Sequence, residues 1–206
     1  PPEATAVNGI TNAMVAGATL DHNRIQSSLA DVHFVIANNA AFDRKFCEKQ
    51  IPVFASLKWC CSMAEIDWGH EGIGSKKLDY IAFRLGFFYD AHRAVADCLA
   101  LIQVLNVKLP RSGVTGFELL SSACEKPSYV FAAINARFEK KDILKARGYS
   151  WDADNKVWHM TVFGKEAAEA EAKWVGDNVY GRPYVGSIHK VGALDRYSDR
   201  PGERIK

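Results

Sequence analysis

A strand followed directly by a helix is the feature that most limits how this chain can fold. The run 33–37 is short, apolar and rich in β-branched residues, and it ends at Asn38 and Asn39. Phe42 and Phe46 follow with the i, i+4 spacing of one helical face. We therefore expect a buried strand, a turn, and a helix that begins at the end of the strand.

The same alternation continues along the first half of the chain. A second candidate strand covers 57–61, and apolar stripes of helical period follow at 78–85 and 95–105, with Ser75 and Asp90 as expected N-caps. Strands that alternate with helices favour an α/β fold with a parallel sheet. The first residues of the chain read as a loop, and a short helix is expected after Asp21.

A break after residue 110 divides the chain into two expected domains, 1–110 and 128–206. Pro110 ends the last helical stripe, and the polar stretch 111–127 is predicted to be a linker. The second domain is predicted to be a small α+β unit with a basic tail. Its expected elements are a strand at 129–134, a helix at 140–147, a hairpin between Trp151 and Trp158, a helix at 168–179 and a strand at 188–194.

Charge is divided unevenly between the two halves. Residues 1–125 hold 11 basic against 13 acidic side chains, and residues 126–206 hold 15 against 11. Clustered acids suit metal binding and a basic half suits phosphate contact, but both halves are also compatible with ordinary solvated surfaces. The cations at Arg137, Lys140, Lys141, Lys145 and Arg147 either face phosphates or only solvate a helix.

The five cysteines are odd in number and have no paired spacing, so we expect reduced thiols with neither disulfides nor a zinc site. No stretch is long and apolar enough for a membrane span, and no signal peptide is recognisable. These features predict a cytoplasmic protein.

Two short motifs contain candidate catalytic residues. The segment 36–43 ends in Asp43, and the segment 91–97 contains His92 and Asp97. Carboxylates can bridge a pair of divalent cations, and a histidine can deprotonate an attacking water near neutral pH. Taken singly, each residue has a simpler role, as a helix-start acid, a surface histidine or a solvated helix residue.

An ordered series of motifs resembles the DEDDh 3′–5′ exonucleases, the group of the DNA polymerase III epsilon subunit, whose fold is ribonuclease H-like. The resemblance covers roughly residues 1–106, and segments 141–151 and 195–200 are similar to the accessory region of a bacterial subgroup. The motifs are Gly9-Ile10-Thr11, Asn39-Ala40-Ala41-Phe42-Asp43, Cys61-Ser62, Lys77-Leu78 and His92-Arg93-Ala94 with Asp97.

The resemblance implies roles for individual residues. Asp43 would hold a metal ion through water, Asp97 would ligate the catalytic metal, and His92 would be the general base. The pocket for the terminal nucleotide would be lined by Asn8, Ile10, Asn39 and Phe42. The implied cofactors are two Mg²⁺ or Mn²⁺ ions, and the implied partners are DNA or RNA 3′ ends, a possible DNA polymerase, and no membrane. Asn38 stands where the family usually has a histidine.

The Asp-x-Glu motif of the family does not occur in the 206 residues. In the family this motif lies on the first strand, before the segment that corresponds to Gly9. We therefore expect the distal part of a bacterial exonuclease fold, without its first strands and without appreciable activity. The alternatives are a non-catalytic nucleic-acid-binding module and an interaction protein whose open strand edge binds a partner. The apolar edge at 33–37 predicts self-association.

Overall fold

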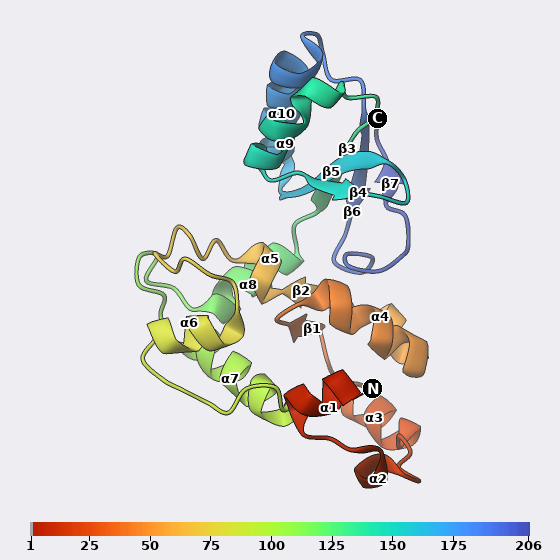
Figure 1. Cartoon of the computed structure of the whole chain (residues 1–206), viewed down its shortest axis with the longest axis vertical. Coiled ribbons are helices and arrows are strands. Elements are labelled where there is room, and N and C mark those ends of the chain that lie inside the picture. Colours follow the sequence, from red (N-terminus) through yellow and green to blue (C-terminus); the bar gives the residue numbers. More distant parts are fainter. Residues whose placement is uncertain (1) are drawn as a thin grey trace.

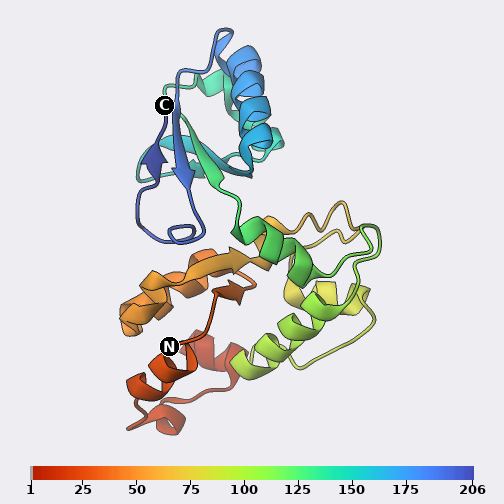
Figure 2. The same cartoon turned by 180° about the vertical axis from the view of Figure 1, so that it is seen from behind.

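Two β-sheets, one parallel and one antiparallel, organise the residues 2–206 that this computed structural model describes (Figure 1). The parallel sheet pairs β1 (Phe34–Ala37) with β2 (Lys58–Cys61), and the antiparallel sheet has the order β4-β5-β3-β6-β7. Each sheet belongs to a separate unit, and the two units lie end to end (Figures 1 and 2). The expected mixed α/β architecture is confirmed, and the ribonuclease H-like arrangement stays a prediction.

The predicted strand–helix–strand unit is present in the first half. Helix α4 (Ala40–Gln50) starts three residues after β1 and carries Asp43 in its first turn. It buries Ala40 and Arg44 and ends at Ile51, because Pro52 opens the short 3-10 helix η1 (Pro52–Ser56). Strand β2 then runs in parallel to β1 and leads into α5 (Ser62–Glu65).

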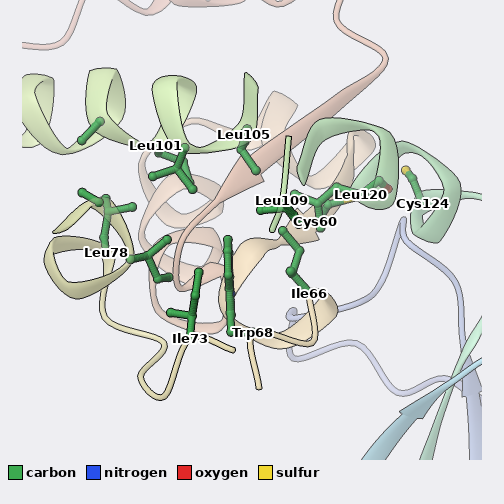
Figure 3. Close-up of a cluster of buried hydrophobic side chains, with 14 of the residues drawn as sticks. Cys60, Ile66, Trp68, Ile73, Leu78, Leu101, Leu105, Leu109, Leu120 and Cys124 are labelled. Carbon is green, nitrogen blue, oxygen red and sulfur yellow. Dashed lines mark hydrogen bonds between the residues drawn. The ribbon is translucent and has the colours of Figure 1, made fainter. Parts of the chain in front are cut away.

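The core of the first unit is built by helices that follow β2. Helices α6 (Leu78–Arg84), α7 (Ala94–Asn106) and α8 (Gly116–Cys124) pack against β2 and the loop around Trp68, whose side chain is fully buried (Figure 3). The buried apolar side chains of this cluster include Cys60, Ile66, Trp68, Ile73, Leu78, Ile81, Val104, Leu105, Leu109 and Leu120.

Helix α8 lies inside the segment 111–127, where the sequence predicted a linker. Thr115 caps this helix: its hydroxyl accepts from the Glu118 backbone, and the Glu118 carboxylate accepts from the Thr115 N–H at 2.7 Å. Leu120 is fully buried in the first core. The connection between the units is therefore confined to a few residues after Cys124, because the polar stretch is an amphipathic helix.

Three more local features differ from the sequence expectations. The first residues form helix α1 (Pro2–Asn8) instead of a loop. Neither Ser75 nor Asp90 caps a helix: α6 begins after Lys77 and α7 after Arg93, and neither of these caps makes a side-chain hydrogen bond. Asp21 does cap its helix α3 (His22–Ser28), because its carboxylate accepts the Arg24 N–H at 2.9 Å.

The apolar stripe predicted for α7 points to solvent over most of its length. Val95, Leu99 and Ile102 are 74%, 61% and 56% exposed, whereas Leu105 is buried. The buried face of α7 instead contains Ala100, Leu101, Val104 and Leu105. Helices α1, α2 (Asn12–Val15) and α3, on the same side of the molecule as α7 (Figure 1), bury none of their described residues. This half of the first unit thus presents an extended apolar surface.

The second unit is an antiparallel sheet with helices on one face (Figures 1 and 2). The predicted hairpin is confirmed, since Trp151 pairs with Trp158 and their ring centroids are 5.5 Å apart. Gly148 ends α9 with a φ of 104°, a left-handed conformation that favours glycine. The elements are β3 (Ser128–Ala133), η2 (Phe138–Lys140), α9 (Lys141–Arg147), β4 (Ser150–Asp152), β5 (Val157–Phe163), α10 (Lys165–Val175), η3 (Gly176–Tyr180), β6 (Ser187–Val191) and β7 (Glu203–Arg204).

Residues 192–200, which we name the docking loop, leave the second unit after β6 and bind the first. The Trp59 N–H of β2 donates to the Ala193 carbonyl at 2.9 Å, so the loop covers the edge of β2. The Arg44 side chain, fully buried, donates to the carbonyls of Ala193, Leu194 and Arg196 at 3.3, 2.6 and 2.7 Å. The loop is therefore held by a guanidinium of α4 as well as by β2.

A second buried guanidinium, that of Arg196 in the middle of the docking loop, links the two units. Arg196 Nη1 donates to Glu65 of α5 at 2.8 Å, and both side chains are essentially inaccessible. Glu65 also accepts from the Tyr197 hydroxyl and from the Cys61 N–H. Burial next to Glu65 raises the pKa of Tyr197 far above its ordinary value, which keeps the phenol protonated as a donor.

None of the helices in residues 2–206 is both long enough and apolar enough to cross a membrane.

We expect the chain to associate with itself through the open edge of β1 and the stripe of α7. Burying apolar surface contributes roughly 25 cal/mol per Å², and the stripe is exposed in the monomer. Sedimentation velocity should therefore show dimers or larger species, and Leu99→Glu should shift the distribution towards monomer. Phe138→Ser is the control, because Phe138 is also an exposed apolar side chain, at 74% against 61% for Leu99, but belongs to the second unit. A monomer at high concentration that binds no hydrophobic dye would contradict the expectation.

We also expect the Glu65–Arg196 pair to show strong coupling in a double-mutant cycle. Arg196→Leu leaves a buried carboxylate without its cation and should reduce the free energy of unfolding by about 3–5 kcal/mol. Glu65→Leu together with Arg196→Leu should be less damaging than the sum of the two single changes. Denaturant titration measures all four proteins. Additive effects would show that the pair is not coupled.

Candidate functional site

Asp43, the first of the predicted metal ligands, sits half-buried in the first turn of α4. Its N–H donates to the Asn39 carbonyl at 3.1 Å. Burial raises the pKa of Asp43, although backbone hydrogen bonds at Asn39 and Asp43 oppose the shift. Among the described residues, no cation forms an ion pair with this carboxylate. An unpaired acid in this position is available to bind a cation from solution.

Asn38, at the position where the resemblance led us to expect histidine, joins the carboxyl ends of the two strands. Its side-chain oxygen accepts from the Ser62 hydroxyl at 2.8 Å, and its carbonyl accepts from the Met63 N–H at 3.1 Å. The Cys61 thiol also donates to this carbonyl at 3.2 Å. The side chain is thus occupied in holding β1 next to β2, where ligands commonly bind in parallel sheets.

His92 and Asp97 lie together at the start of α7. The His92 N–H donates to Asp97 Oδ1 at 3.4 Å, and the His92 ring is exposed. His92 has a φ of 71°, a left-handed conformation that is unusual for a residue with a side chain. Strain of this kind clusters at functional sites, because the surrounding structure must hold it in place. At His92, the hydrogen bond from the backbone N–H to the Asp97 carboxylate helps to hold this conformation.

Tyr89 also contacts the Asp97 carboxylate, and the sequence did not single it out. Burial, and then a hydrogen bond to Asp97, raise the pKa of the Tyr89 phenol well above its ordinary value. The hydroxyl is consequently a donor throughout the physiological pH range. Asp97 therefore has two neighbours, a phenol and a backbone N–H, that orient its oxygen atoms.

The Asn8–Ile10 segment lies next to this group, although it is 85 residues away in the sequence. Arg93 Nη1 donates to the Asn8 carbonyl at 3.1 Å. The Asn8 side chain accepts from the Ile10 N–H at 2.8 Å, and Gly9 between them has a φ of 69°. Two of the four predicted nucleotide-binding residues, Asn8 and Ile10, are thus brought to the neighbourhood of His92.

The other two predicted nucleotide-binding residues, Asn39 and Phe42, lie at the start of α4. Asn39 is exposed, and Phe42 is 60% exposed with its ring packed against Phe46 at 4.9 Å. No hydrogen bond among residues 2–206 joins Asn39 or Phe42 to Asn8 or Ile10. The predicted pocket residues thus come from two elements that no hydrogen bond among residues 2–206 joins, the start of α4 and the segment that contacts Arg93.

The described residues do not make up a two-metal site. No group of three or more His, Cys, Asp or Glu side chains in residues 2–206 could hold a metal ion. None of the hydrogen bonds in this range joins Asp43 to His92 or Asp97. Two divalent cations need several bridging carboxylates, and the described residues do not provide such a group.

Two cavities lie away from the predicted residues. The larger, about 550 Å³, lies between α10, η3 and Lys206, and the smaller, about 280 Å³, lies between the second sheet and the docking loop. Neither is lined by Asp43, His92 or Asp97. The cavities and the strained His92 backbone with its Asp97 contact therefore lie in different places.

Comparison with protein-family models, with curated proteins and with solved structures found no match to this chain.

The raised pKa of Asp43 predicts a pH-dependent effect of Asp43→Asn. The stability due to a carboxyl group with a raised folded-state pKa is fully present below its unfolded pKa and is lost as pH rises through the folded pKa. The variant should therefore match the parent below about pH 4 and be more stable at neutral pH, by less than about 1 kcal/mol. Thermal unfolding across this pH range measures the difference. A variant that is less stable at neutral pH would show that the helix dipole dominates over burial.

Proposed function

We propose that this chain is the distal portion of a DEDDh-type 3′–5′ exonuclease that binds nucleic-acid 3′ ends. The observation that carries the proposal is the contact between Arg93 and Asn8, at 3.1 Å. It brings the Gly9 motif next to the His92 motif from opposite ends of the first unit. Both motifs belong to the ordered series that resembles this family, and their contact supports the proposal.

The chemistry of this group suits the end of a nucleic-acid strand. Arg93 supplies a cation for a phosphate, and the Arg93 side chain is anchored on one backbone carbonyl only. The exposed His92 ring offers an N–H that can donate a hydrogen bond to a phosphate oxygen. Ile10, which is 38% exposed, offers an apolar surface for a terminal base or sugar. Binding of this kind needs no metal ion.

Hydrolysis is a separate matter, because it needs carboxylates that this chain does not bring together. Asp43 and Asp97 would contribute to the binding of Mg²⁺ or Mn²⁺ only in a complete enzyme that also supplies the Asp-x-Glu acids. We therefore propose that the chain alone binds 3′ ends without degrading them. A non-catalytic nucleic-acid-binding module, the alternative function, makes the same prediction for this chain, and a polymerase partner is a further proposal from the resemblance.

The proposal predicts end-dependent binding without cleavage. A 5′-labelled single strand with a free 3′ hydroxyl should bind more tightly than the same strand whose 3′ end carries a bulky blocking group, when both are measured in EDTA. Arg93→Gln should weaken the preference, since it removes the cation next to Asn8 and Ile10. Arg84→Gln is the matched control, because Arg84 is a cation of the same unit on α6. Equal affinity for the two ends would contradict the proposed function.

Incubation with Mn²⁺ and a 3′-labelled oligonucleotide tests the second part of the prediction. We expect no progressive shortening, with or without His92→Ala. Shortening that disappears in His92→Ala would show that the chain contains a complete active site after all.

A further inference from the structure

The outer surface of α9 combines free cations with an exposed aromatic ring. Residues 137–147 contain five basic and two acidic side chains, a net charge of +3. Phe138 is 74% exposed, and Lys141 Nζ lies 4.2 Å from the centre of its ring. Lys145 is exposed one helical turn beyond Lys141. These three residues, Phe138, Lys141 and Lys145, are here called the α9 stripe.

Two neighbouring cations of this segment, Lys140 and Arg147, are already used inside the protein. Lys140 donates to the Asn178 carbonyl at 2.8 Å, which ties η2 to η3. Arg147 forms an ion pair with the buried Glu171 at 2.9 Å and covers the Trp174 ring. Lys141 and Lys145, in contrast, form no ion pair with any described residue. Lys141 and Lys145 thus have no acidic partner to give up when they bind a ligand, although Lys141 also lies over the Phe138 ring.

The geometry of the α9 stripe fits a single strand of nucleic acid. Residues four apart on a helix lie about 6 Å apart along its axis, a distance comparable to the spacing of successive phosphates in an extended strand. An exposed aromatic ring can stack on a base only if the base is unpaired, and stacking on aromatic rings tolerates any sequence. Trp151 is a weaker candidate, because its ring packs against Trp158 at 5.5 Å.

We propose that the α9 stripe binds single-stranded nucleic acid, with Lys141 and Lys145 on phosphates and Phe138 stacked on a base. The inference rests on the proposed function, since it places a second contact on the strand whose 3′ end the first unit would hold. It also assigns the phosphate contacts expected of the basic second half to two lysines, and a base contact to Phe138. The Asp142 and Glu139 carboxylates flank the stripe and limit the number of phosphates that it can neutralise.

The test is a titration of the full chain with a fluorescent oligothymidylate in EDTA, at several salt concentrations. Lys141→Gln with Lys145→Gln should flatten the slope of log affinity against log salt by about 1.4, because each phosphate contact on a single strand contributes about 0.7. Phe138→Ala should weaken binding roughly fivefold or more at unchanged slope, and Phe138→Trp should retain the affinity.

The matched control is Lys165→Gln with Lys173→Gln on α10, which removes the same charge from side chains that are 79% and 78% exposed. If this control flattens the slope as much as the α9 variant, binding is diffuse and the proposal is wrong. Tighter binding of a duplex, or full competition by polyglutamate, would also overturn it, since each would assign the stripe to another ligand.

The two proposals fail in different ways. Loss of the preference for a free 3′ hydroxyl concerns the residues around Arg93, whereas the α9 stripe should bind blocked and unblocked strands equally. Weak binding of both strands that depends on Phe138 would support the stripe and contradict only the 3′-end site.

Discussion

Burial of two arginine side chains, Arg44 and Arg196, is the constraint on which the arrangement of the two units depends. Each guanidinium is removed from water, so each must have all its donors satisfied inside the protein. Arg44 finds three carbonyls of the docking loop and Glu48, and Arg196 finds Glu65, Ser128 and the Lys126 carbonyl. Partners of Arg196 come from both units. The two units therefore have one favourable relative position, because any other would leave one of these charges without its partners.

A buried ion pair such as Arg196–Glu65 contributes more to the specificity of docking than to stability. The desolvation of two buried ions offsets most of their attraction, so the net stabilisation of a buried pair is small. A wrong docking of the loop, however, leaves a charge without its partner and is strongly disfavoured. Arg200 makes similar contacts nearer the surface, where its guanidinium donates to Glu48 at 3.1 Å and to Asp195 at 2.7 Å.

Local features of the fold could be predicted from the sequence, and long-range ones could not. The β-branched run at 33–37 and the Trp151–Trp158 hairpin were recognisable because their patterns extend over a few neighbouring residues. Helix α8 was mistaken for a linker because its few buried positions lie in a polar stretch, although the Thr115–Glu118 pair is a capping-box signal that could have shown it. The outward orientation of Val95 and Leu99 depends on what packs against α7, which periodicity alone does not show.

In the candidate site, too, local features could be predicted from the sequence and long-range contacts could not. Asp43 and His92 were identified from short motifs, and the structure then placed them in separate neighbourhoods. Tyr89 and Arg93 were missed as partners because their importance arises from contacts with Asp97 and Asn8, which lie 8 and 85 residues away in the sequence. Single-residue patterns carry no information about such contacts.

The hydrogen bond between Trp59 and Ala193 gives the order of chain synthesis a role in folding. The edge of β2 is completed by a residue that follows it by more than a hundred positions, and closure of such a long loop is slow. During translation the first unit would emerge with that edge unpaired, and with Arg44 and Glu65 lacking their partners in the docking loop. The docking loop would then complete the first unit, which acquires its final structure only after residues 192–200 have left the ribosome.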